Sequence, residues 1–182
     1  MAGSARRRTP GAALPLSAPS QADAATFCGK DALALKISLT NAQANGEDDV
    51  IQIQTGTFTP SSASFVYQSA EANSLTITSG YSIACASQSL GAQFTMIDGG
   101  GTKAPLSIDT TAAESSVSIN NLTLQNGVSV GSAAPLHLAS TGGVGVENVL
   151  VRANQVDGFA ADLSSNNGSV TLRNVVCVDN TA

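Results

Sequence analysis

Three eight-residue stretches of this chain carry nearly the same pattern. They read VSINNLTL at 117–124, VGVENVLV at 144–151 and VTLRNVVC at 170–177, with starts 27 and 26 residues apart. Each copy follows the order apolar, any, apolar, any, Asn, apolar, any, apolar. A fixed period of about 20–50 residues is typical of a chain built from stacked structural repeats.

The Asn of each copy interrupts the alternation, because the two apolar positions after Asn121, Asn148 and Asn174 are shifted by one. Asn tolerates left-handed backbone dihedrals and bonds to nearby backbone, so it suits a corner between two short strands. A further apolar pair precedes each copy, which gives three short strands per repeat. These pairs are Leu106/Ile108, Leu136/Leu138 and Ala161/Leu163. The sequence therefore predicts an all-β fold, a right-handed parallel β-helix (solenoid) with three short strands per turn and an N-terminal capping helix.

Equivalent residues of successive turns would stack about 4.8 Å apart, as neighbouring strands do in a sheet. Asn121, Asn148 and Asn174 are then expected to have a structural role, as a ladder in which each side-chain amide bonds the next. A propeller blade usually needs about 40 residues or more and longer strands, so it fits less well. The inward columns would be Val117–Val144–Val170, Ile119–Val146–Leu172, Leu122–Val149–Val175 and Leu124–Val151–Cys177.

The length and the net charge of the chain exclude some classes of binding partner. The 182 residues make one domain or part of one. Charged residues are only 12%, against roughly 25% in an average globular protein, and the net charge is −5. An acidic chain whose basic cluster is confined to Arg6–Arg8 is not expected to bind nucleic acid. No apolar run approaches the roughly 18–20 residues of a membrane span, so no transmembrane segment is predicted.

Residues 1–25 read as a disordered leader or a degenerate signal segment, and 26–182 as the repeat domain with its cap. Asp31 is the predicted N-cap of the helix, and Asn45-Gly46 is its predicted end. Its apolar face is expected to hold Leu33, Ile37 and Ala44. Short strands are then expected within VIQIQTGTF (50–58), SLTITSG (74–80), FTMIDGGG (94–101) and PLSID (105–109).

The three cysteines are an odd number without CxxC spacing, and His137 is the sole histidine. No metal site and no cofactor are therefore predicted. Cys28 and Cys85 are a candidate disulfide pair if the protein is exported, whereas Cys177 fits a small core residue of its column.

The order of a cap helix, DDVIQIQTGTF, IDGGG and repeats of the type NLTLQNG resembles the N-terminal part of secreted bacterial right-handed parallel β-helix repeat proteins. These belong to the broad pectate-lyase-like superfamily, and the resemblance covers about residues 26–182. It implies the fold, an extracytoplasmic (secreted or cell-surface) location and a helical cap, but no particular activity. Because no helix follows the last strand, we expect either a truncated chain or an open C-terminal end that is covered by a partner or, through self-association, by another copy.

Enzymes of that superfamily act on polysaccharides with clustered carboxylates on an outer face. His137 and Asp162 are predicted to be outward neighbours, and a His–Asp pair can serve acid–base chemistry. They are the weak candidates for catalytic residues, and a surface hydrogen bond on a polar face is the simpler interpretation. Glu147 and Arg173 are predicted to form an ordinary surface ion pair.

Two functions follow as hypotheses. The first is an exported, non-enzymatic module of the surface or adhesion type that binds polysaccharide or cell-surface glycan weakly. The second is a polysaccharide lyase or hydrolase, or an inactive fragment of one. Analogy of fold alone cannot choose between them, because unrelated functions share folds.

Overall fold

The computed structural model describes residues 24–129 and 134–182. The predicted leader therefore lies outside the described residues, apart from its last two, of which Ala25 already belongs to a strand. The elements in chain order are β1 (Ala25–Gly29), α1 (Ala32–Ala42), β2 (Asp49–Gln54), β3 (Gly56–Phe58), β4 (Phe65–Ser69), β5 (Leu75–Tyr81), the short 3-10 turns η1 (Ile83–Cys85) and η2 (Ala92–Phe94), β6 (Thr95–Asp98), β7 (Leu106–Thr110), β8 (Val117–Gln125), β9 (Leu136–Ser140), β10 (Val144–Arg152), β11 (Ala161–Ser165) and β12 (Val170–Val178).

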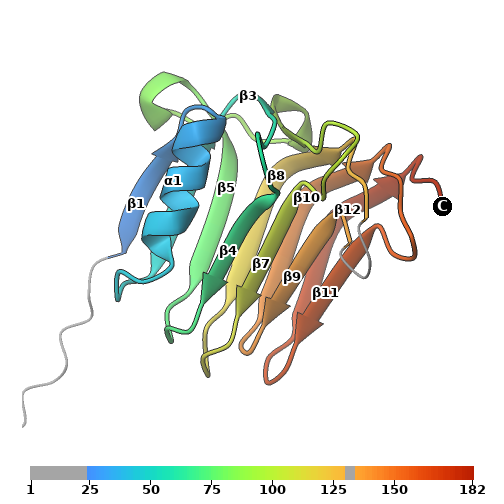
Figure 1. Cartoon of the computed structure of the whole chain (residues 1–182). Helices are drawn as coiled ribbons and strands as arrows, with labels where there is room; N and C mark the ends of the chain where they lie inside the picture. The colour runs from blue at the N-terminus through green and yellow to red at the C-terminus, as the bar shows by residue number, and fades with distance from the viewer. Residues whose placement is uncertain (1–23, 130–133) are drawn as a thin grey trace, which may run out of the picture.

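The strands form two sheets whose ladders are parallel (Figure 1). The larger sheet has eight strands, with the order β1-β2-β5-β8-β10-β12 and with β3 and β6 attached beside this path. The smaller sheet has four strands in the order β4-β7-β9-β11. Apolar side chains from both sheets and from α1 form one continuous buried core.

The prediction of an all-β solenoid with three strands per turn is wrong. The structure has two mostly parallel sheets with a helix packed against the larger one, which is an α/β arrangement. The reason lies at the corner Asn residues, because the backbone bends there without ending the strand. Each repeat consequently supplies one nine-residue strand, as in β8 and β10, and one five-residue strand, as in β7 and β9.

The repeat spacing does set the register of the larger sheet. Val144 of β10 pairs with Val117 of β8 on one side and with Val170 of β12 on the other. Asn148 donates from Nδ2 to Asn121 Oδ1 at 3.3 Å, and Asn174 donates likewise to Asn148 Oδ1 at 2.7 Å. The three Asn residues have φ angles of 60°, 52° and 52°, in the left-handed region that Asn tolerates.

The helix begins as predicted but buries a different face. The Asp31 carboxylate accepts a hydrogen bond from the Ala34 backbone N–H at 2.7 Å, which confirms the N-cap. The helix ends at Ala42, before the predicted Asn45-Gly46 stop. The expected apolar face is also wrong, because Leu33 and Ile37 are exposed. The residues of α1 that are buried are Leu35, Ser38, Leu39 and Ala42.

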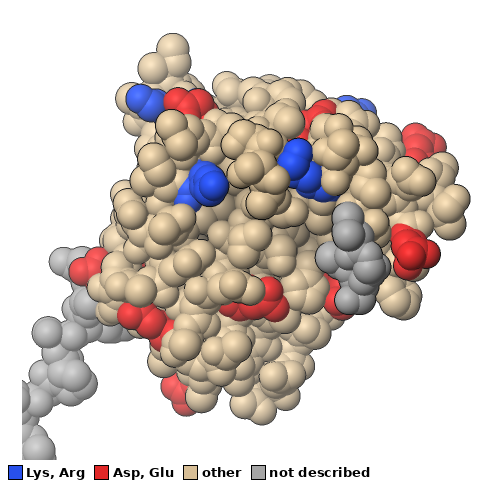
Figure 2. Space-filling model, viewed as in Figure 1, with Lys and Arg blue, Asp and Glu red and all other residues tan. Residues whose placement is uncertain are grey.

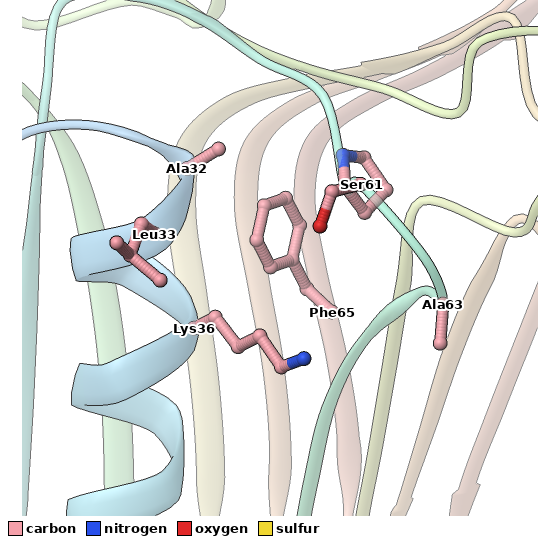
Figure 3. A pocket seen from close by; sticks show the side chains of 7 residues that line it. Ala32, Leu33, Lys36, Ser61, Ala63 and Phe65 are labelled. Atoms are coloured by element: carbon pink, nitrogen blue, oxygen red, sulfur yellow. The ribbon is translucent and has the colours of Figure 1, made fainter.

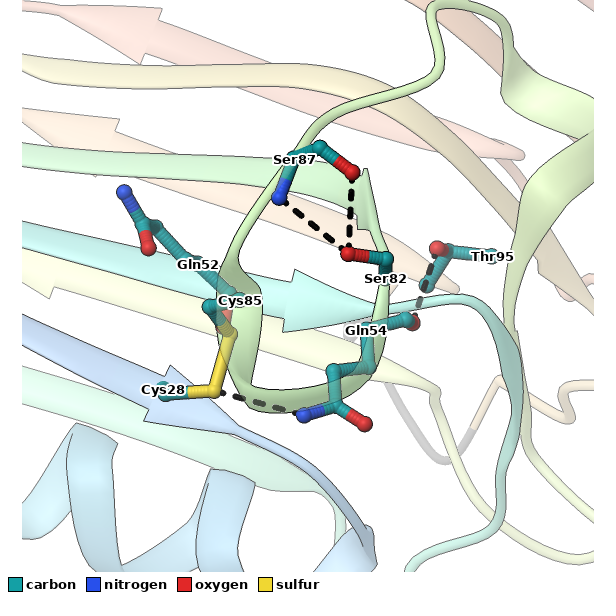
Figure 4. The surroundings of a disulfide bond; sticks show 7 residues. All are labelled: Cys28, Gln52, Gln54, Ser82, Cys85, Ser87 and Thr95. Carbon is teal, nitrogen blue, oxygen red and sulfur yellow. Dashed lines mark hydrogen bonds between the residues drawn. A yellow bond between two sulfur atoms is a disulfide. The ribbon is translucent and has the colours of Figure 1, made fainter.

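A disulfide joins Cys28 of β1 to Cys85 of η1, which lie 57 residues apart in sequence (Figure 4). The Gln54 side chain donates a long hydrogen bond to Cys28 Sγ at 3.5 Å. The disulfide bond ties β1, the first strand of the larger sheet, to the loop that follows β5. Cys177 on β12 is a free, exposed thiol rather than the core residue expected of its column.

Among the described residues, none of the helices has the length and apolar character needed to cross a membrane.

Candidate functional site

The outward face of the four-stranded sheet holds a row of polar side chains. Alternation along β7, β9 and β11 turns the apolar residues, such as Ile108 and Leu138, into the core. The intervening residues face outward, and the register places Ser107, His137 and Asp162 side by side on adjacent strands. The structure therefore brings together the His137–Asp162 pair that the sequence singled out.

His137 contacts two carboxylates rather than one. Its Nδ1 lies 3.0 Å from Asp162 Oδ2, and its Nε2 lies 3.1 Å from Asp109 Oδ1. An ionised carboxylate only accepts hydrogen bonds, so both ring nitrogens must carry protons for both bonds to form. This geometry therefore suits an imidazolium clamped between two carboxylates, a row with a net charge of −1.

All three side chains of this Asp109–His137–Asp162 row remain partly exposed. A hollow of about 260 Å³ lies beside Asp109 and is open to solvent. Its other lining residues are Gln68, Ser69, Ala70 and Thr111. The row can thus be reached by a polar ligand that enters this hollow.

The contact between Asp109 and His137 was not predicted from the sequence. Asp109 stands opposite Ala139 rather than His137, and it reaches the imidazole along the diagonal between neighbouring strands. The sequence does contain a signal for Asp109: it follows the outward Ser107 by two positions, and residues two apart in a strand lie on the same face.

The charges on the visible surface are sparse (Figure 2). Most of this face is uncharged, and Lys and Arg appear only in its upper half.

On the larger sheet, Arg173 Nη1 lies 3.8 Å from Glu147 Oε1, with both side chains largely exposed. Such a pair contributes little to stability or chemistry.

A second amide ladder, which the sequence reasoning also missed, lies where the long strands end. Asn154 is buried and donates from Nδ2 to Asn180 Oδ1 at 2.9 Å, while its Oδ1 accepts from the Gly127 backbone N–H at 2.7 Å. The sequence signal for this ladder is that Asn154 and Asn180 stand at equivalent positions after the second and third copies of the repeat. Both ladders are structural, since their polar atoms are used within the fold.

Asp98 organises the glycine turn that follows β6. Burial alone would raise the pKa of Asp98, but hydrogen bonds from Gln125, the Gly100 backbone N–H and Asn126 outweigh burial and lower it. The carboxylate is therefore an internal hydrogen-bond acceptor of the turn. A neighbouring hollow of about 370 Å³ is lined mainly by glycine and backbone of this turn and the loops beside it.

An apolar hollow of about 250 Å³ separates α1 from the segment that leads into β4 (Figure 3). In that view the Lys36 side chain extends from α1 toward the β4 side of the hollow. Lys36 is the sole charged residue in its lining, beside Phe65 and small side chains. A single ammonium with apolar walls offers no acid–base pair, so this hollow is a weaker candidate than the row on the four-stranded sheet.

In the described ranges 24–129 and 134–182, no group of three or more His, Cys, Asp or Glu side chains is arranged to hold a metal ion. No family model, curated protein or solved structure matches this chain. The resemblance to secreted repeat proteins therefore stays a prediction, and the function must be argued from the geometry of the site.

Proposed function

We propose that this chain is an exported, non-enzymatic surface module that binds neutral glycans weakly on the outward face of its four-stranded sheet. The observation that carries the proposal is the partly exposed Asp109–His137–Asp162 row, whose Asp109 lines a hollow that is open to solvent. Both ring nitrogens of His137 are used within the row, so the row presents the remaining acceptor sites of two carboxylates. Sugar hydroxyls can donate to these carboxylate oxygens.

The charge and shape of this face support a neutral ligand and a low affinity. The net charge of −1 on the row disfavours acidic sugars, because they would bring further carboxylates against it. The outward residues of the three strands include no Trp, Tyr or Phe side chain on which a sugar could stack. They are Ser107 and Asp109 of β7, His137 and Ala139 of β9, and Asp162 and Ser164 of β11.

The disulfide supports an extracytoplasmic location. Disulfides persist in oxidising compartments, whereas cytosolic thiols are kept reduced. The Cys28–Cys85 bond joins β1, at one edge of the larger sheet, to η1 across a sequence separation of 57 residues. Secretion or surface display is the location that such a bond favours.

A glycoside hydrolase is the second candidate, because Asp109 and Asp162 flank one site from alternate strands. Their carboxylates contact opposite nitrogens of the His137 ring, at 3.0 Å and 3.1 Å, so the two acids stand on either side of one position, as the two carboxyl groups of an inverting enzyme do. However, one of the two must hold a proton to act as the general acid. In this structure each carboxylate accepts a hydrogen bond from His137, an arrangement that favours binding over cleavage.

Binding should be tested with the full chain and a panel of neutral oligosaccharides from glucan, xylan and mannan, followed by calorimetric titration of those that bind. Asp109→Asn and Asp162→Asn should each weaken binding about tenfold, since a hydrogen bond to a charged group contributes roughly 1.5–3 kcal/mol. Glu147→Gln is the matched control, an exposed acid on the other sheet, and should bind like the wild type.

The proposal fails if the wild type binds none of the panel, or if both Asn variants bind as well as the wild type. Release of new reducing ends from the same oligosaccharides, lost in both variants, would support the hydrolase instead.

A further inference from the structure

The hollow between α1 and the segment that leads into β4 has its origin in the sequences on its two sides (Figure 3). Residues 59–64, between β3 and β4, read TPSSAS and contain only small side chains and one proline. On the helix, Leu35 and Leu39 are buried in the core, whereas Leu33 and Lys36 line the hollow. A space of about 250 Å³ therefore remains that the described residues do not fill.

The walls of this hollow present apolar surface to a ligand. Phe65 lines the hollow and is only 2% exposed, because the core holds the rest of its side chain. Leu33, on the helix side, is 68% exposed. An apolar group that enters the hollow would remove surface of Leu33 from water, which favours binding.

Lys36 adds one positive charge to these apolar walls. Its side chain extends from α1 toward the β4 side of the hollow (Figure 3). None of the ion pairs within residues 24–129 and 134–182 involves its ammonium group. Asp31, the acid at the start of the same helix, caps the Ala34 backbone N–H and does not line the hollow. The Lys36 ammonium can therefore pair with an anionic group of a ligand.

The volume and the lining restrict the kind of ligand. A water molecule takes up about 30 Å³ of the liquid, so 250 Å³ corresponds to roughly eight groups of that size. Pockets for drug-sized ligands are usually larger, about 300–1,000 Å³. Ser61 supplies the sole side-chain hydroxyl of the lining, which leaves few partners for the hydroxyls of a sugar. A compact apolar acid fits this hollow better than a glycan does.

We propose that the hollow between α1 and β4 is a binding site for small monocarboxylates with an apolar body, aromatic or short aliphatic. The carboxylate pairs with the Lys36 ammonium, while Leu33 and Phe65 contact the apolar body. The site is separate from the Asp109–His137–Asp162 row, whose net negative charge disfavours anions. The inference therefore does not depend on glycan binding.

Titration of the full 182-residue chain with benzoate and with hexanoate, followed by NMR of the backbone amides, tests the proposal. The amides of Leu33, Lys36 and Ala63 should shift in a saturable manner, with a dissociation constant of about 1 mM for ligands of so few atoms. Benzyl alcohol is similar in size but uncharged, and should bind about fivefold more weakly than benzoate. Saturation by either acid supports the proposal, and the tighter of the two shows whether the preferred body is aromatic or aliphatic.

Three variants assign the binding to this hollow. Lys36→Gln removes the charge at little cost to the helix, and should weaken benzoate about fivefold while leaving benzyl alcohol unchanged. Lys30→Gln is the matched control, because Lys30 is an exposed lysine just before α1 that does not line the hollow. It should bind benzoate like the wild type. Ala63→Leu places a larger side chain in the hollow and should weaken the acids and the alcohol alike.

The proposal is overturned if neither acid gives saturable shifts at about twenty times the expected dissociation constant. Equal losses in Lys36→Gln and Lys30→Gln, with both variants folded by circular dichroism, would also overturn it. Shifts of the same amides with protein concentration alone would show that a second copy covers the hollow, against the proposal.

Discussion

At the scale of single residues, Asn carries most of the specificity of this fold. The corner Asn residues combine two properties that no apolar residue offers, a left-handed backbone and an amide that bonds to the equivalent amide of the next strand. Asn154 and Asn180 repeat the device at the ends of the long strands. Because the corner Asn residues of successive repeats lie on adjacent strands, their side-chain amides form a continuous column of hydrogen bonds.

Asn148 allows the two properties to be separated. Asn148→Ala removes both its ladder hydrogen bonds and its tolerance of φ 52°, and should lower the free energy of unfolding by about 2–3 kcal/mol. Asn148→Gly loses the same hydrogen bonds but adopts that backbone freely, so it should recover about 1 kcal/mol of this loss. Urea unfolding of both variants measures the difference. Equal losses would show that the backbone conformation costs nothing at this corner.

At the scale of elements, the repeats allow the sequence to predict strand register, whereas a strand outside the repeats can be missed. The three copies determine the register of β8, β10 and β12, because a shift by one residue would expose every apolar side chain. The single-copy strand β4 has an alternating pattern but no repeat to mark it, and it was not predicted. The sequence also does not show that each long strand continues through its corner Asn. That continuity is the reason why the structure has two sheets rather than three.

The helix and the site show the same limit. α1 is apolar on more than one side, so Leu33 and Ile37 compete in the sequence with Leu35 and Leu39 for the buried face. Only docking against β1 and β4 decides between them. His137 and Asp162 could be paired from the repeat spacing, whereas the contact with Asp109 depends on a diagonal that the pattern does not specify.

The disulfide secures β1, which pairs with β2 alone in the part of the chain that the structure describes. Replacing Cys28 and Cys85 together by Ser should lower the free energy of unfolding by about 4 kcal/mol, the loop-closure value for a separation of 57 residues. Thermal unfolding with and without a reducing agent measures this loss. Cys177→Ser should keep the full sensitivity to reduction, because Cys177 takes no part in the bond. Unchanged unfolding after reduction of the wild type would contradict the assigned role.

At the scale of the whole molecule, the two ends differ in how they are held. One end carries α1 and the disulfide, whereas at the other end β11 and β12 each have a strand neighbour on one side among residues 24–129 and 134–182. Interactions in this arrangement are mostly between adjacent strands, so stability should vary along the stack rather than be shared evenly.

Hydrogen exchange of the full chain should therefore show a gradient. Amides of β12 (Val170–Val178) should exchange at least about tenfold faster than those of β8 (Val117–Gln125), which has strand partners on both sides. Mass spectrometry of peptides covering the two strands measures the ratio at low protein concentration. Equal exchange in β8 and β12 would mean that the two strands open together, and that a strand with one described neighbour is held as firmly as a strand with two.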